Sequence, residues 1–176
     1  MNTNSQIERT KEYARQLAEQ LKLSPKPIVT FHPAGAFAYQ PSKGKPIVYL
    51  YQFTPEELAH EMGHIYLFQR HPFLSSVAQS LYELRPLTTF LGGITPIALI
   101  RERPLWGKPL LKSIPLSILG MLAGYGIATI PKLLEESAAT QVGIRGLKQL
   151  GYQPAPGLTR REMKFLYSYA KPHVSS

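Results

Sequence analysis

The chain contains no cysteine and no aspartate, and these absences narrow the chemistry available to its 176 residues. Without cysteine it has no disulfide, no thiolate metal ligand and no thiol nucleophile. All eleven acidic residues are glutamates, so any carboxylate chemistry must use glutamate. An apolar N-terminal stretch is also missing: the first 24 residues carry too many charged side chains for a signal peptide, and none is expected.

Acidic residues are outnumbered by basic ones, and the formal net charge is +9. The lysines and arginines are scattered and form no block interleaved with aromatic residues, so we expect no nucleic-acid partner. Contact with an anionic lipid surface fits this charge better.

Hydrophobic periodicity and turn residues predict a single α+β domain spanning 1–176, mostly helical with a small antiparallel β-hairpin or sheet. Thr54 is placed to cap a helix that begins with Pro55, and Pro72 should stop that helix. The second and third strands should form the hairpin. The expected helices are 5–23, 55–70, 132–150 and 159–172, and the expected strands are 27–31, 35–40 and 46–52.

The middle of the chain changes character, because residues 86–100 and 113–131 carry no charge. The second run reaches the length of a membrane span, and Gly120 and Gly124 would let two helices approach closely. We interpret 86–131 as a central hydrophobic helical hairpin inserted into a membrane. A soluble domain whose central helix pair is buried against itself is the alternative.

The stretch LAHEMGHIY places His60 and His64 four residues apart in the helix predicted over 55–70. Positions i and i+4 share one helix face, so both rings can bind one metal ion, and neutral imidazole suits Zn²⁺. Glu61 lies beside them, where it can act as a general base toward a metal-bound water. This is the HExxH arrangement of metallopeptidases.

A catalytic zinc needs a third protein ligand. His32, His71 and His173 lie in no element that obviously returns to this helix. Glu136 is the favoured candidate, because it shares a helix face with small residues that permit close packing. We expect its neighbour Glu135 to be solvated or to support a ligand from behind.

The chain resembles membrane-associated zinc metallopeptidases of the HtpX and YugP types, which are HExxH-plus-glutamate enzymes (gluzincins). Three segments carry the resemblance in the same order: GAFAYQPSKGKPIVYL (35–50), ELAHEMGH (57–64) and EESAAT (135–140). Several such proteins also insert an apolar helical hairpin between the last two segments. The resemblance covers residues 30–150 and implies a zincin-like fold.

The resemblance implies one zinc ion held by His60, His64 and Glu136, with Glu61 as general acid and base. It also implies that an edge strand formed by Ala36, Phe37, Ala38 and Tyr39 aligns a peptide substrate by strand addition. The chain departs from the family at Gly35, which stands where an asparagine is usual. It departs again at Thr140, where an acidic or amide residue commonly supports a histidine ligand.

We therefore expect a zinc-dependent metalloendopeptidase that hydrolyses peptide bonds in peptide or protein substrates and contacts a lipid membrane. The resemblance favours a cytoplasmic active site. The basic residues in the loop between the two apolar runs favour a cytoplasmic location for that loop instead. These two indications conflict, because a hairpin that crosses the membrane places its loop and the active site on opposite sides. A soluble cytoplasmic protein is the alternative location. One alternative function is a non-catalytic membrane adaptor or partner protein that retains the zinc site. Another is a basic protein that binds nucleic acid or a lipid surface, with the HEMGH motif incidental.

Overall fold

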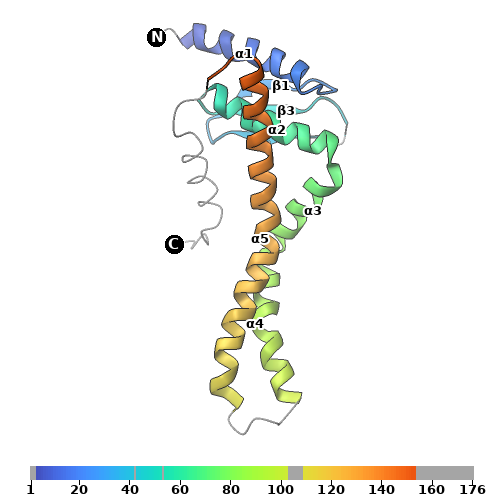
Figure 1. Ribbon diagram of the computed structural model, residues 1–176, viewed down its shortest axis with the longest axis vertical. Coiled ribbons are helices and arrows are strands. Elements are labelled where there is room, and N and C mark those ends of the chain that lie inside the picture. Colours follow the sequence, from blue (N-terminus) through green and yellow to red (C-terminus); the bar gives the residue numbers. More distant parts are fainter. Residues whose placement is uncertain (1–2, 42, 53, 103–108, 154–176) are drawn as a thin grey trace. The chain divides into compact units, whose positions relative to one another are not determined.

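The computed structural model describes residues 3–41, 43–52, 54–102 and 109–153. It is an α+β fold dominated by helices, as the sequence predicts (Figure 1). The predicted helix over 159–172 and His173 lie outside the described residues. The described elements are α1 (Thr3–Gln20), β1 (Ile28–Phe31), β2 (Phe37–Tyr39), β3 (Ile47–Leu50), α2 (Pro55–Arg70), α3 (Pro72–Glu83), α4 (Arg85–Glu102) and α5 (Pro109–Gln149).

The chain forms two compact units. The first comprises Met1–Ser75 and Glu135–Ser176, and the second comprises Ser76–Leu134. Helix α5 is continuous through residue 134, so its N-terminal part belongs to the second unit and its C-terminal part to the first.

The first unit contains a three-stranded sheet in the order β1–β3–β2. The predicted hairpin is confirmed, because β2 and β3 pair antiparallel with Ala38 opposite Val48. Strand β1 pairs with β3 in parallel, so the sheet is mixed rather than antiparallel as expected. The chain leaves β1, forms the edge strand β2 and then returns through the centre as β3, which makes β1 and β3 run in the same direction.

The core of the first unit lies where α1, α2 and the sheet meet. Strand β3 alternates, with Val48 and Leu50 fully buried and the residues between them partly exposed. Full burial of a leucine or isoleucine side chain contributes roughly 1.5–3 kcal/mol. The core comprises Ala14, Leu17, Ala18, Leu21 and Leu23 from α1 and the turn after it, Val48 and Leu50 from β3, Leu58, Ala59, Met62 and Ile65 from α2, and Leu147 from α5.

Helix α2 has the predicted ends, and its start is fixed by a cap. The Thr54 side chain accepts a hydrogen bond from the backbone N–H of Glu57 at 3.2 Å, and Pro55 occupies the first turn. The Glu57 carboxylate accepts hydrogen bonds from the backbone N–H groups of Tyr51 and Gln52, which ties the end of the sheet to the helix. This cap sets where each later side chain of α2 lies.

Helices α2 and α5 touch backbone to backbone at two glycines. A Cβ atom at Gly63 of α2 would overlap the carbonyl of Ala139 on α5, and a Cβ atom at Gly143 of α5 would overlap the carbonyl of Ala59 on α2. Each helix thus supplies one glycine to the crossing. The close packing expected of Gly143 and Ala139 is confirmed.

Helix α5 corrects the predicted start of a helix at residue 132, because it runs unbroken for 41 residues with Pro115 and Pro131 inside it. A proline in a helix interior removes one backbone hydrogen bond, but the other backbone groups continue the helix through both prolines. Helix α5 ends as predicted at Gly151, which has a φ of 83°. The N–H groups of Gly151 and Tyr152 donate to the carbonyls of Lys148 and Leu147, a Schellman motif.

The second unit pairs α4 with the first part of α5, and small residues line the contact. A Cβ atom at Gly92 would overlap the carbonyl of Gly120, and one at Gly124 would overlap the carbonyl of Thr88. The predicted role of Gly120 and Gly124 in close helix approach is therefore confirmed.

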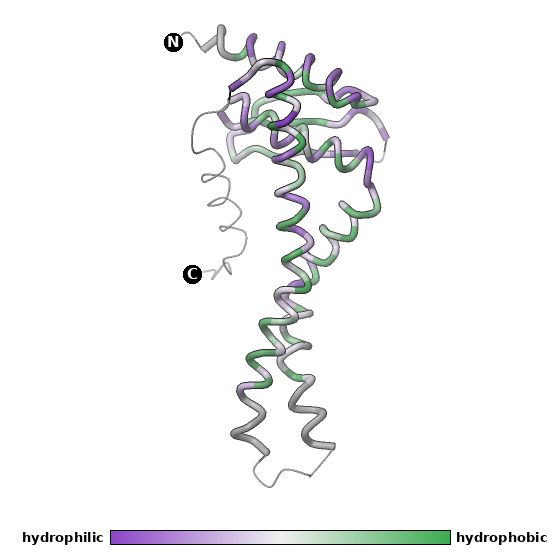
Figure 2. The backbone as a smooth tube through the Cα atoms, in the orientation of Figure 1, coloured by the Kyte–Doolittle hydropathy of each residue, from purple (hydrophilic) through white to green (hydrophobic). Residues whose placement is uncertain are grey.

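Apolar residues are frequent along this helix pair (Figure 2), and many of their large side chains are exposed. By length and composition, residues 115–149 of α5 could cross a membrane, and 17% of the apolar window within them is buried. The exposed side chains along α4 and α5 are Leu87, Phe90, Leu91, Ile94, Leu116, Ile118, Leu119, Met121, Leu122, Ile127, Ile130 and Leu134.

The glycine crossing of α2 and α5 makes a direct prediction for stability. Gly63→Ala should destabilise the chain by about 1–3 kcal/mol, because the added methyl group meets a backbone carbonyl that cannot swing aside. Gly126→Ala is the matched control, since a Cβ atom there makes only an ordinary 3.7 Å contact with Ile130. Thermal unfolding followed by circular dichroism should give a lower midpoint for the first variant only, and equal midpoints would contradict the crossing.

Candidate metal centre

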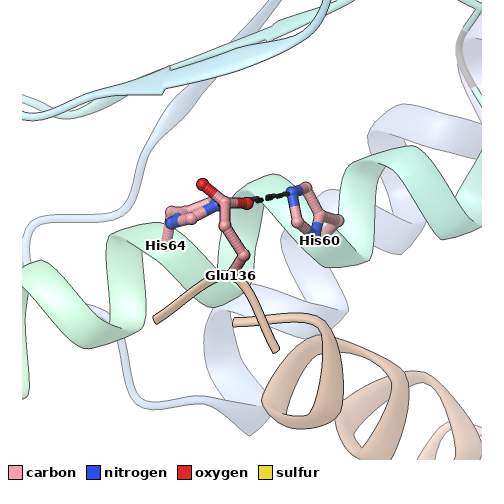
Figure 3. Close-up of side chains that lie close together, drawn as sticks. All are labelled: His60, His64 and Glu136. Carbon is pink, nitrogen blue, oxygen red and sulfur yellow. Dashed lines mark hydrogen bonds and ion pairs between the residues drawn. The ribbon is translucent and has the colours of Figure 1, made fainter. Parts of the chain in front are cut away.

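Helix α2 presents His60 and His64 one turn apart on the same face, and α5 brings Glu136 to them from 72 residues further along the chain (Figure 3). The Nε2 atoms of the two histidines are 3.3 Å apart. The Glu136 Oε2 atom lies 3.3 Å from Nε2 of His60 and 3.1 Å from Nε2 of His64. The three atoms therefore form a nearly equilateral triangle.

The size of this triangle fits a tetrahedral metal ion. In a regular tetrahedron the distance between ligand atoms is about 1.63 times the metal–ligand bond, so bonds of about 2.0–2.1 Å give edges of about 3.3–3.4 Å. The three observed distances, 3.1–3.3 Å, lie close to that value. One ion above the triangle can therefore reach all three atoms with little movement of the side chains.

Each imidazole ring also has a hydrogen-bond partner at Nδ1, the ring nitrogen that faces away from the triangle. Nδ1 of His60 lies 2.8 Å from Oγ1 of Thr140, and Nδ1 of His64 lies 3.3 Å from Oε1 of Glu135. When each Nδ1–H donates to its oxygen, each Nε2 keeps a free lone pair directed at the triangle. The two oxygens thus orient the rings as partners of metal-binding histidines commonly do.

Of the two expectations for Glu135, the structure agrees with the supporting position. Its side chain is only 6% exposed and lies 3.3 Å from Nδ1 of His64. Thr140 lies one helical turn beyond Glu136, where it meets His60. Position 140, where the family commonly has an acidic or amide residue, is a threonine that contacts His60. A supporting carboxylate is present instead at Glu135, which contacts His64.

Carboxylates are concentrated in and beside the cluster. Three buried glutamates lie there, namely Glu61, Glu135 and Glu136. Burying carboxylates is costly unless positive charge or hydrogen bonds compensate, and His64 supplies part of that compensation through its contacts with Glu135 and Glu136. A divalent cation at the triangle would add further positive charge.

Two pKa shifts reflect this environment. Burial alone would lower the pKa of His64, but hydrogen bonds to the carboxylates of Glu135 and Glu136 outweigh it and raise that pKa to about 9. Burial raises the pKa of the Glu61 carboxyl above its ordinary value, and the charges of His60 and His64 offset part of that rise. The triangle therefore stabilises positive charge, while Glu61 is a stronger base than an exposed glutamate.

The predicted substrate strand lies at an edge of the sheet, since β2 is the terminal strand in the order β1–β3–β2. Phe37 and Tyr39 are exposed, whereas Ala38 packs against the core. Ala36 immediately precedes the strand. Strand β2 also packs against α2, the helix that carries the two histidines.

The other described histidines do not join the cluster. His32 packs edge-on against the rings of Phe37 and Tyr49, and its Nδ1 accepts a hydrogen bond from the backbone N–H of Ala34. His71 is exposed at the C-terminal end of α2. Within the described ranges, the group that could hold a metal ion consists of His60, His64 and Glu136.

Comparison of the chain with protein-family models, with curated proteins and with solved structures finds no match.

The geometry predicts different effects on zinc binding for substitutions at Glu136, a corner of the triangle, and at Glu135, which supports His64. Glu136→Ala should lose bound zinc, because one corner of the triangle disappears. Glu135→Gln should keep zinc with about 10–100-fold weaker affinity, because His64 loses only its supporting carboxylate. Zinc content after dialysis and competition with a chelator give both values, and Glu83→Gln on the exposed face of α3 is the control. Full zinc in Glu136→Ala would show that Glu136 is not a ligand.

Proposed function

We propose that the protein is a membrane-associated zinc metalloendopeptidase. The observation that carries the proposal is the triangle of His60 Nε2, His64 Nε2 and Glu136 Oε2, combined with a buried glutamate, Glu61, next to the first ligand. Two histidines and one carboxylate are a ligand set of catalytic zinc, whereas magnesium and calcium prefer oxygen ligands throughout. The resemblance to HtpX-type and YugP-type enzymes supports the same assignment.

A zinc ion bound there would act as a Lewis acid and lower the pKa of water to about 7. Glu61 takes the proton from the attacking water and delivers it to the leaving amine as the peptide bond breaks. Its raised pKa suits both steps, because the group must accept a proton and then release it. Glu135 and Thr140 hold the two rings while the charge at the site changes.

The peptide substrate would lie along β2 as an added strand. Strand addition uses the free backbone N–H and C=O groups of an edge strand, so it positions many sequences in the same way. Because β2 packs against α2, a peptide paired with Ala36–Tyr39 runs close to the catalytic helix. This assignment rests on the family resemblance together with the edge position of β2.

A zinc-binding adaptor without catalysis is the alternative, and it would be marked by a fourth protein ligand. Three residues form the group among the described residues, and His71, a possible fourth ligand in this alternative, is exposed at the end of α2. The three-ligand geometry favours the enzyme, since it leaves a position for water.

Glu61→Gln tests the catalytic step. The variant should retain zinc, because Glu61 is outside the triangle, and should lose about 10²–10⁴-fold in hydrolysis of an unfolded protein such as casein. Zinc content and cleavage rate are measured on the same preparation, with Glu83→Gln as control. Undiminished cleavage by Glu61→Gln would contradict the mechanism, and zinc-loaded wild-type protein without any cleavage would favour the adaptor.

Membrane association is supported by the exposed apolar side chains of the second unit, because soluble proteins rarely expose contiguous apolar patches of this extent. At the start of α4, the Arg85 guanidinium lies 4.6 Å from the ring centre of Tyr82 and 5.5 Å from that of Tyr125. An arginine between tyrosines is typical of the boundary between lipid and water. We assign the active site to the cytoplasmic side from the family resemblance.

The absence of cysteine makes the membrane assignment easy to test. Phe90→Cys and Leu119→Cys, both 63% exposed in the chain, should react slowly with N-ethylmaleimide in lipid vesicles, because apolar lipid disfavours the reactive thiolate. Lys43→Cys in the turn between β2 and β3 should react rapidly. All three should react fully in sodium dodecyl sulfate, and equally rapid labelling in vesicles would place the hairpin in water.

A further inference from the structure

A cavity lies in the first unit, away from the metal centre, at the place where three helices end. It has a volume of about 250 Å³ and is lined by the C-terminal parts of α1, α2 and α5. Three of its lining residues are cations from different elements, namely Lys22, Arg70 and Arg145. We propose that this cavity binds a phosphate group.

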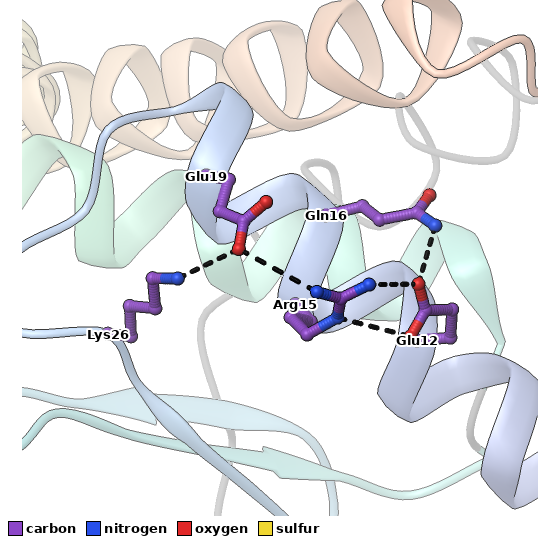
Figure 4. Close-up of polar contacts among 5 residues, drawn as sticks. All are labelled: Glu12, Arg15, Gln16, Glu19 and Lys26. Atoms are coloured by element: carbon purple, nitrogen blue, oxygen red, sulfur yellow. Dashed lines mark hydrogen bonds and ion pairs between the residues drawn. The ribbon is translucent and has the colours of Figure 1, made fainter.

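Among the residues that the structure describes, the three cations differ from their neighbours in having no carboxylate partner. Figure 4 shows Arg15 bonded to Glu12 and Lys26 bonded to Glu19, at 2.7 Å and 2.9 Å. Within the described part of the chain, Lys22, Arg70 and Arg145 form no ion pair. All three side chains are exposed, so together they make the cavity positively charged and attractive to an anion.

The backbone at Lys22 strengthens the case. Its φ is 53°, in the left-handed region, and it ends α1 through a hydrogen bond from the Leu23 N–H to the Ala18 carbonyl. Glycine is the usual residue at this position of a helix end, because a side chain there is strained. Lys22 therefore brings a positive charge to the cavity from a backbone position at which glycine is the usual residue.

Charge and shape favour phosphate over a carboxylate. The negative ends of three helix dipoles, about −0.5 each, offset half of the +3 charge and leave about +1.5. A phosphate monoester carries about −1.5 to −2 near neutral pH and presents three equivalent oxygens, one for each cation. The two arginines can bind such oxygens in pairs, and the side chains of Gln20 and Gln149, bonded to each other at 2.9 Å, add donors at the rim.

Calorimetric titration of the full chain in a nonionic detergent tests the proposal, with inorganic phosphate and glycerol 3-phosphate as probes. A chelator in the buffer prevents phosphate from binding through a metal ion at His60, His64 and Glu136, so the result is independent of the proposed peptidase activity. Saturable binding at one site is expected. Its absence for both probes would overturn the proposal.

Two variants identify the site. Arg145→Gln and Lys22→Gly should each weaken binding at least about tenfold, since each removes one charged contact. Lys22→Gly should not lower the unfolding temperature, because glycine suits the left-handed backbone, so loss of binding cannot be attributed to unfolding. The double variant Lys43→Gln and Lys45→Gln removes two exposed charges elsewhere and should bind within about twofold of wild type. Equal weakening in that control would reduce the effect to overall charge and overturn the site.

A final titration with dihexanoyl phosphatidic acid distinguishes the source of the phosphate. Affinity at least tenfold above that of glycerol 3-phosphate, lost in Arg145→Gln, identifies a lipid headgroup. Equal affinity for both probes identifies a soluble phosphate compound. Both results place the phosphate in the cavity, whereas lipid binding that Arg145→Gln leaves unchanged would place it elsewhere.

Discussion

The backbone contact between α2 and α5 is the constraint on which the site depends. Two glycines bring the helix axes closer than any side chain would allow, and the three triangle atoms lie within a short distance of that crossing. Glutamate has a long side chain, but Glu136 meets His60 and His64 at 3.1–3.3 Å while remaining buried, which requires adjacent backbones. The same closeness places Glu135 and Thr140 behind the rings.

Electrostatics then gives the crossing its chemical character. Buried carboxylates and imidazoles would be an unfavourable core on their own, and hydrophobic residues of equal volume would pack there at less cost. The cluster therefore lowers the folding stability below that of an apolar core, and in return forms a site that favours a cation. The cationic cavity has the opposite sign, and it lies where the helices end rather than where they cross.

Local features of the chain could be predicted from sequence, and features that depend on distant pairing could not. Thr54, Pro55 and Pro72 define both ends of α2 because capping and proline act on neighbouring residues. The parallel pairing of β1 with β3 depends on residues far apart in the chain, so no pattern within either strand predicts it.

The candidate site divides in the same way. His60 and His64 share a face by helical spacing alone, and Glu136 could be favoured because small residues accompany it. The contact of Glu135 with His64 could not be predicted, because neighbouring residues on a helix point about 100° apart and only the crossing geometry decides which ring each meets. The continuity of α5 through Pro131 was missed because proline usually ends a helix.

The order of the residues along the chain also sets the order in which the site is assembled during synthesis. His60 and His64 are made first, and the ribosome must add 72 further residues after His64 before Glu136 exists. Those residues include α3, α4 and the apolar part of α5. At about 5–20 residues per second the interval is several seconds. Throughout that time the nascent chain has only two of the three residues of the triangle, so the triangle is completed only after the apolar hairpin has been made.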